Sequence, residues 1–288
     1  HTVLYNTSGL KDGTYTATIK VTTPGAVNSP QLITVTLTVS GELHSTDSIV
    51  GDLMMVPAGS FMQGSPTMEA CRYPDETQFE HTLSRGLAVM ATEVTRQMWT
   101  DLREVQPTLP EDRTNPDYGA GLDNPVQQLT WFEAVLFANL LSVERGLTRC
   151  YYTDAAFTTP VTVANYTTDP VYCDFNATGF RLLTEGEWEY ACRAGSTRPF
   201  HVDEPNYSWQ TCINASTLGM FPALETVAWL WSNSSEKNAS SQVATKKPNA
   251  WGLFDMHGNV FEWCWDWYKN VYPTASATDY TGDRKSVV

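Results

Sequence analysis

At 288 residues the chain is long enough for one large domain with a well-buried core, or for one domain and part of another. Its formal net charge of -14 comes from 32 acidic and 18 basic residues, and no basic run could follow a phosphate backbone, which argues against nucleic acid as a partner. No apolar run approaches the length of a membrane-spanning helix, and an aromatic content of 12% argues against a disordered chain.

Residues 1–41 have the pattern of an all-β unit. Threonine alternates with apolar residues over residues 15–21 and 31–39, which predicts two strands joined by a turn that contains Pro and Gly. Because two or three strands cannot bury both faces of a sheet, we expect this segment to be the end of a β-sandwich. The sequences NTSGL at residues 6–10 and NSPQ at residues 28–31 resemble the end of bacterial BACON-type immunoglobulin-like domains. This resemblance implies a partial all-β immunoglobulin-like sandwich, with any signal peptide or anchor upstream.

The polar segment at residues 42–52 is expected to be a linker, and residues 53–288 a second domain. The first helix of this domain is predicted over residues 96–105, where Thr95 offers a hydroxyl N-cap and apolar residues recur on one face. A second helix is predicted to begin after Thr130, again with a threonine as its N-cap.

A third helix is predicted to begin at Thr184 and to end at Gly195. Glu187 follows Thr184 at the spacing of a capping box, in which two side chains satisfy two backbone donors of the first turn. Residues 207–248 are rich in Asn, Ser, Thr and Gly and show little periodicity, which predicts irregular loops with short strands. The second domain is therefore expected to be α+β, with few helices and short strands.

Spacing argues against two kinds of active site. Glu185, Glu187 and Glu189 fall on alternating sides of the third helix, so they cannot converge as the acid and base of a glycosidase. The five histidines lack the pair spacing of a metal-binding helix, and no CxxC pair suggests a zinc ribbon or a thioredoxin-like site.

Two longer sequences carry a family resemblance. RLLTEGEWEYACRAG at residues 181–195 and NAWGLFDMHGNVFEW at residues 249–263 resemble hallmark sequences of the formylglycine-generating enzyme and sulfatase-modifying factor family, and residues 91–95 and 124–131 match its earlier signals. The resemblance implies an irregular C-type lectin-like fold over residues 53–288, C-terminally incomplete. Five residues of the two hallmark sequences are expected to be structural: Thr184, Glu187, Trp188, Asn259 and Trp263.

The same resemblance implies a calcium site. In calcium-binding members the matching ligands would be the side chains of Asp255 and Glu262 and the backbone carbonyls of Gly258 and Val260, and hard cations of this kind take six to eight oxygens. The alternative is that Asp255 and Glu262 accept hydrogen bonds from backbone donors in a buried turn.

Six cysteines are spread along the chain. In the oxygen-dependent enzymes of the family, two closely spaced cysteines after the second hallmark bind Cu(I), and this sequence has no cysteine after Cys264. Copper is therefore expected only if further sequence supplies that pair. Cys192 and Cys264 are expected to be buried. Cys150 and Cys173 flank a threonine-rich excursion, and we predict a disulfide between them.

Three functions remain open. The first is a secreted or cell-surface binding module, which presents a lectin-like head to an unknown protein or carbohydrate ligand, as the resemblance to ligand-displaying proteins diversified by retroelements suggests. The second is a copper- and oxygen-dependent oxidase that converts a sulfatase cysteine to formylglycine. The third is a structural component of a surface layer or filament. Because immunoglobulin-like modules are typical of exported proteins, an extracytoplasmic binding module is preferred.

Overall fold

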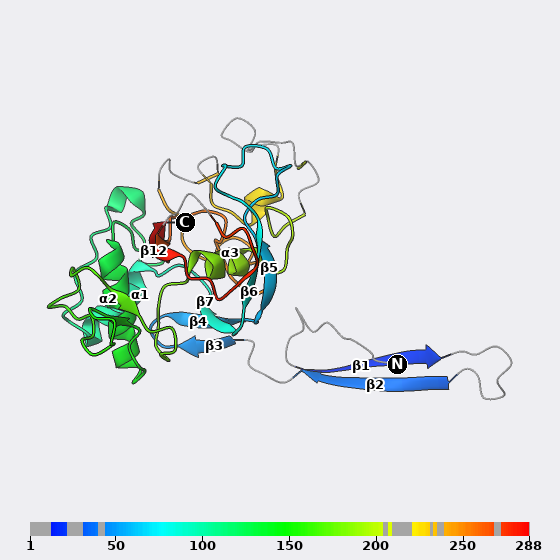
Figure 1. The fold of residues 1–288 in the computed structure, drawn as a ribbon, viewed down its shortest axis with the longest axis horizontal. Helices are drawn as coiled ribbons and strands as arrows, with labels where there is room; N and C mark the ends of the chain where they lie inside the picture. The colour runs from blue at the N-terminus through cyan, green and yellow to red at the C-terminus, as the bar shows by residue number, and fades with distance from the viewer. Residues whose placement is uncertain are drawn as a thin grey trace. The chain divides into compact units, whose positions relative to one another are not determined.

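The computed structural model describes residues 13–21, 31–39, 44–203, 207–208, 221–230, 233–234, 239–267 and 272–287 (Figure 1). The chain divides into two compact units, His1–Ser45 and Thr46–Val288.

In the first unit, β1 (Gly13–Val21) pairs antiparallel with β2 (Gln31–Val39), in a register that joins Gly13 to Val39 and Val21 to Gln31. Both strands cover the stretches in which threonine alternates with apolar residues. Residues 6–10 and 28–30, which carry the resemblance to immunoglobulin-like domains, lie outside the described residues. The sandwich itself stays a prediction.

The second unit holds three helices and several small sheets among its described residues. In chain order these helices and strands are β3 His44–Asp47, β4 Gly51–Val56, β5 Gly59–Gln63, β6 Phe79–Leu83, β7 Leu87–Met90, α1 Arg96–Val105, α2 Trp131–Glu144, β8 Tyr151–Tyr152, β9 Tyr172–Cys173, α3 Glu185–Arg193, β10 Trp263–Trp267, β11 Ala277–Thr278 and β12 Asp283–Val287. β4 is the middle strand of one sheet, in the order β3-β4-β7, and β6 is the middle strand of another, in the order β11-β6-β5. Two further pairs, β8-β9 and β10-β12, are antiparallel.

β3 and the start of β4 lie within residues 42–52, where the sequence predicts a linker. The carboxylate of Asp47 explains why this polar segment forms an ordered turn. One oxygen of Asp47 accepts hydrogen bonds from the N–H groups of Ile49 and Val50, and Arg145 forms an ion pair with the same carboxylate. Val50 is 1% exposed, so the turn is anchored to the core of the second unit.

All three predicted helices are present, and each begins after a threonine. The hydroxyl groups of Thr95, Thr130 and Thr184 accept hydrogen bonds from the third residue of their helices. The capping box at α3 is confirmed, since Glu187 accepts the N–H of Thr184 at 2.8 Å. The helix ends slightly earlier than predicted, at Arg193, because Ala194 adopts the left-handed conformation.

The two hallmark sequences pack against each other around α3. The amide of Asn249 donates to the carbonyl of Ala191 at 2.7 Å, and the N–H of Trp265 donates to the carbonyl of Leu183 at 2.8 Å. Residues 255–262 form neither helix nor strand. The expected few helices, short strands and irregular loops are therefore observed in the second unit.

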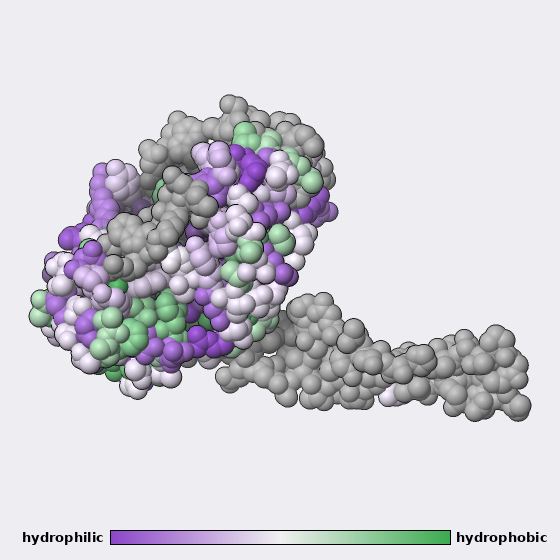
Figure 2. Space-filling model, viewed as in Figure 1, coloured by the Kyte–Doolittle hydropathy of each residue, from purple (hydrophilic) through white to green (hydrophobic). Residues whose placement is uncertain are grey.

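Figure 1 places α3 near the middle of this unit, with α1 and α2 on one side and β5 and β6 on the other. Hydrophobic residues on the face visible in Figure 2 gather mainly over α1 and α2, and much of the remaining described surface is polar or neutral. None of the helices in the described part of the chain combines the length and apolar character that crossing a bilayer requires.

Candidate functional site

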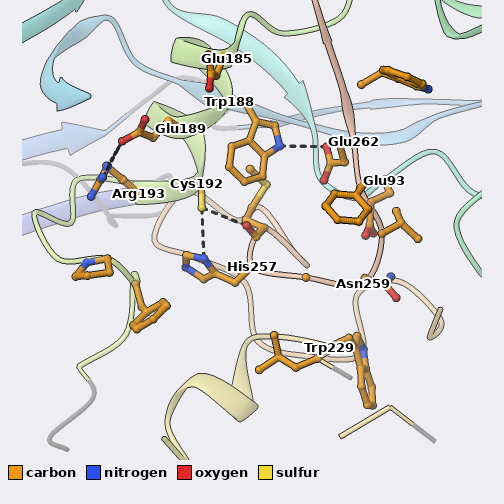
Figure 3. Close-up of a pocket in the computed structure, with 18 of the residues that line it drawn as sticks. Glu93, Glu185, Trp188, Glu189, Cys192, Arg193, Trp229, His257, Asn259 and Glu262 are labelled. Atoms are coloured by element: carbon orange, nitrogen blue, oxygen red, sulfur yellow. Dashed lines mark hydrogen bonds and ion pairs between the residues drawn. The ribbon is translucent and has the colours of Figure 1, made fainter. Parts of the chain in front are cut away.

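An open pocket of about 1310 Å³ lies beside α3 (Figure 3). The helix, the irregular segment 256–262 and Trp263 at the start of β10 all contribute to its wall, so the pocket forms where the two hallmark sequences meet. Its rim includes Phe261, which is 85% exposed. The side chains that α3 contributes are Glu185, Trp188, Glu189, Cys192 and Arg193.

The lining of this pocket is acidic. Its titratable side chains include six glutamates but only two arginines, Arg72 and Arg193, and Arg193 is paired with Glu189 at 2.7 Å. The described lining therefore carries an excess of carboxylates, which agrees in sign with the charge of the whole chain. The six glutamates are Glu69, Glu76, Glu93, Glu185, Glu189 and Glu262.

Two of these residues, Glu93 and Glu262, are half-buried, and their carboxylates are close enough to influence each other. The indole N–H of Trp188 donates to Oε2 of Glu262 at 3.3 Å. Burial, followed by the charges of Glu262 and Asp255, raises the pKa of Glu93 well above its usual range. Burial also raises the pKa of Glu262, while the hydrogen bond from Trp188 opposes the shift.

Glu93 was not singled out in the sequence. Both of its carboxylate oxygens are buried without a hydrogen-bond donor. Asn259 lies near enough to lower the pKa of Glu93 slightly, but its amide donates to the carbonyl of Ser241 at 3.2 Å. The only sequence signal was the position of Glu93 between Thr92 and Val94 in a family-like stretch, and such a stretch does not show what the carboxylate faces.

Asp255 is the second half of the predicted calcium site. Its Oδ2 accepts the N–H of Ala244 at 2.8 Å, which is the role that the alternative interpretation gave it, but its Oδ1 is buried without a partner. The carbonyl of Gly258 accepts the N–H of Val260 at 3.0 Å. Both Asp255 and Asn259 have positive φ angles, 58° and 69°, which bend this segment tightly.

These oxygens fit a hard cation in kind, because buried carboxylate oxygens without donors need a positive charge or a proton. Within the described ranges, however, no three His, Cys, Asp or Glu side chains converge closely enough to hold a metal. A calcium ion bound to Asp255 and Glu262 would therefore need backbone oxygens, such as those of Gly258 and Val260, to complete its shell.

Cys192 and His257 lie side by side at the pocket wall (Figure 3), with 3.5 Å between Sγ and Nδ1. Burial raises the pKa of the Cys192 thiol far above its usual range and lowers the pKa of His257 to about 3. The backbone N–H of His201 donates to Nε2 of His257 at 3.3 Å, so the neutral ring of His257 carries its proton on Nδ1. At neutral pH this pair is a thiol and a neutral imidazole, and not a thiolate with an imidazolium.

The predicted disulfide between Cys150 and Cys173 is absent, because both cysteines are free. Tyr151, and not Cys150, is the direct partner of Cys173 across the β8-β9 ladder. Successive side chains of a strand point to opposite sides, so Cys150 and Cys173 leave the ladder in different directions. Cys192 and Cys264 are buried, as predicted, with exposures of 6% and 0%, and Cys71 is disulfide-bonded.

Of the three glutamates of α3, only Glu187 lies outside the pocket lining. Glu185 and Glu189 are one helical turn apart and both line the pocket, so the expectation that the three glutamates of α3 lie on alternating sides is wrong for this pair. Glu187 forms two 2.6 Å hydrogen bonds with Arg181, Glu189 pairs with Arg193, and Glu185 accepts the hydroxyl of Tyr272 at 2.7 Å.

The residues expected to be structural make structural contacts. Beyond the capping pair of Thr184 and Glu187, the indole of Trp263 donates to the carbonyl of Leu129 at 3.0 Å, and Asn259 exchanges hydrogen bonds with the backbone of Ser241. Trp188 differs, because its hydrogen bond holds a pocket carboxylate.

Comparisons with known proteins agree with this architecture. Residues 40–287 match the sulfatase-modifying factor enzyme 1-like domain. Among solved structures, Treponema denticola variable protein 1 superposes with a TM-score of 0.61 and 27% identity, and the match covers 84% of each chain.

Two curated relatives differ in how much they share with this chain. The chaperone protein LppX of Paenibacillus barcinonensis is 28% identical over 250 residues, which are 77% of this chain and 74% of that protein. The formylglycine-generating enzyme of Streptomyces coelicolor is 36% identical over 104 residues, which are 35% of this chain and only 30% of the enzyme.

Proposed function

Since this chain belongs to the sulfatase-modifying factor enzyme 1-like family, we propose that it is an extracytoplasmic binding module that presents the pocket beside α3 to a ligand. The observation that carries the proposal is the pocket itself, which is open, about 1310 Å³ in volume and lined by both aromatic and carboxylate side chains. Clefts of this kind, with a few polar groups among apolar ones, are the usual form of ligand sites.

The burial of the free thiols supports a binding function over an oxidase function. In the part of the chain that is described, Cys150, Cys173, Cys192 and Cys264 are free, and burial raises the pKa of each thiol. Copper(I) chemistry uses thiolates, which such burial disfavours. The likeness to Treponema denticola variable protein 1 over 84% of both chains adds support from the scaffold.

Calcium is part of the proposal as a structural ion. Asp255 and Glu262 would hold it together with the carbonyls of Gly258 and Val260, and the ion would supply a partner for Oδ1 of Asp255, which is otherwise buried without a donor. Its role would be to fix the 255–262 segment that shapes the pocket wall.

An extracytoplasmic location is proposed on the disulfide at Cys71, because structural disulfides form and persist mainly in oxidising compartments.

The alternative function is a formylglycine-generating oxidase. The identity to the Streptomyces coelicolor enzyme favours it, but that match spans only 30% of the enzyme, and this chain has no cysteine after Cys264 to pair for copper. Copper would be expected only where further sequence supplies two cysteines.

Retention of a ligand by the immobilised protein separates the two functions. The wild type is exposed to arrays of purified glycans and short peptides, beside the variants Phe261→Ser and Tyr73→Ser. Both side chains are exposed, at 85% and 68%, but only Phe261 lines the pocket, so Tyr73→Ser controls for a lost surface aromatic. Binding that Phe261→Ser alone abolishes supports the module. Retention of nothing, together with copper-dependent loss of thiol from a cysteine peptide under oxygen, would instead support the oxidase.

A further inference from the structure

We infer that the pocket accepts an organic ammonium group, held between the carboxylates of Glu93 and Glu262 and beside the ring of Trp188. The inference rests on the proposed binding function and specifies the chemistry of the ligand. It depends on three features of the described residues: the carboxylate oxygens that lack donors, the excess of negative charge in the lining, and the aromatic wall.

The first feature is the carboxylate of Glu93. Glu93 lines the pocket, and both of its carboxylate oxygens are buried from water without a hydrogen bond of ordinary geometry. A buried acceptor without a donor is costly, so a native protein generally supplies a partner, which can be a ligand. Glu262 adds a second carboxylate nearby, and the protein satisfies one of its oxygens through Trp188. A donor that carries positive charge would complement both carboxylates.

The second feature is the charge of the whole lining. Six glutamates face the pocket, and of its two arginines Arg193 is already committed to Glu189. An anionic ligand would meet repulsion from nearly every side of the described wall. A cationic ligand would be attracted, and low-dielectric walls strengthen that attraction.

The third feature distinguishes an organic cation from a metal ion at Glu93. A hard metal ion needs six to eight oxygens, whereas no three acidic, His or Cys side chains converge in the described residues. The pocket instead offers aromatic rings from Trp188, Phe261 and Trp263. Ammonium groups bind over such rings as well as to carboxylates.

The same wall already contains one example of this interaction. The ammonium nitrogen of Lys246 lies 4.0 Å from the centre of the Trp229 ring, and Trp229 lines the pocket.

A matched pair of small probes tests the inference. 2-Phenylethylammonium and 2-phenylethanol have nearly the same shape and differ in charge. Calcium and the ammonium group would compete for Glu262, so calorimetric titration of the full chain is done in EDTA and measures the contribution of the charge. We expect the ammonium probe to bind at least about tenfold more tightly, which corresponds to roughly 1.4 kcal/mol. Equal affinities for the two probes would overturn the ammonium inference, while binding of both would leave the binding function standing.

Two substitutions locate the site. Glu93→Gln keeps the shape of the side chain and should reduce the affinity for 2-phenylethylammonium about tenfold, without changing the affinity for 2-phenylethanol. Glu104→Gln removes an exposed carboxylate on α1 that is not in the pocket lining and should leave the probe affinity within about twofold. An ammonium affinity that Glu93→Gln leaves unchanged contradicts the inference. If Glu93→Gln does not fold, the two probes on the wild type still decide whether charge is recognised, and Glu262→Gln replaces it as the test of location.

Discussion

Trp188 and Glu262 join the two hallmark sequences, because the indole N–H of Trp188 on α3 donates to Oε2 of Glu262 at 3.3 Å. This hydrogen bond crosses from a regular helix to an irregular segment, and both residues line the same pocket. It therefore ties the shape of the pocket wall to the position of a helix that is fixed by its own capping box.

Removal of this single donor tests the link. Trp188→Phe keeps an aromatic ring but leaves Oε2 of Glu262 without its donor, and we expect unfolding in urea to show a loss of about 1–2 kcal/mol. Trp229→Phe is the matched control, because its indole donates at 3.0 Å to the exposed hydroxyl of Thr245, which water can replace. Equal losses in the two variants would show that ring size, and not the hydrogen bond, matters.

The ion pair between Arg181 and Glu187 should contribute far more to the free energy of unfolding than an exposed ion pair does. Arg181 binds Glu187 through two 2.6 Å hydrogen bonds, and their side chains are only 14% and 11% exposed. Arg181→Met leaves a buried carboxylate without its counter-charge, so we expect a loss of about 3–5 kcal/mol in unfolding free energy. Arg198→Met breaks the exposed pair with Asp203 and should cost less than about 1 kcal/mol. Similar losses of unfolding free energy in Arg181→Met and Arg198→Met would show that burial does not increase the cost of breaking the ion pair.

Asp266 should make stability fall as pH rises. Burial raises its pKa from 3.8 to about 8, although the N–H of Glu185 donates to it. Between these values the native state keeps a proton that the unfolded chain has released, so this group lowers the free energy of unfolding by about 1.4 kcal/mol for each pH unit. Below pH 3.8 both states are protonated and the effect is absent.

Asp266→Asn removes this contribution. Urea unfolding from pH 4 to pH 8 should show a shallower decline for the variant, with the stability difference between the two proteins growing in favour of the variant as pH rises. Parallel curves for wild type and variant would mean that Asp266 does not hold a proton in the native state.

Calcium should raise the midpoint of thermal unfolding if the predicted site forms, because an ion that binds only the native state stabilises it. We expect calcium to raise the midpoint of thermal unfolding, relative to EDTA, in the wild type but not in Asp255→Asn. Asp154→Asn is the control, because Asp154 lies on an exposed loop whose backbone it caps. A midpoint that calcium leaves unchanged in the wild type would remove the calcium proposal.

Alkylation after unfolding, without a reducing agent, should count the free thiols. We expect Cys150, Cys173, Cys192 and Cys264 each to take one iodoacetamide adduct in mass spectra of the digested chain, and Cys71 to take none. In the native protein, Cys192 and Cys264 should react far more slowly because both are buried. A peptide that joins Cys150 to Cys173 would restore the disulfide that the sequence suggested.

The sequence by itself determined the local elements and the family. Threonine caps at Thr95, Thr130 and Thr184 mark the helix starts because each hydroxyl bonds a backbone donor three residues away, within one turn. The hallmark sequences at residues 181–195 and 249–263 identified the scaffold in the same way, through the order and spacing of neighbouring residues.

Only the tertiary structure decided which distant groups meet. It brought Glu93 toward Glu262, offset Cys150 from Cys173 by one position in a ladder, and joined residues 46–52 to the second unit. The physical reason is that burial, charge coupling and strand register depend on packing between segments far apart in the chain. The pattern around any one of these residues contains no information about its partner.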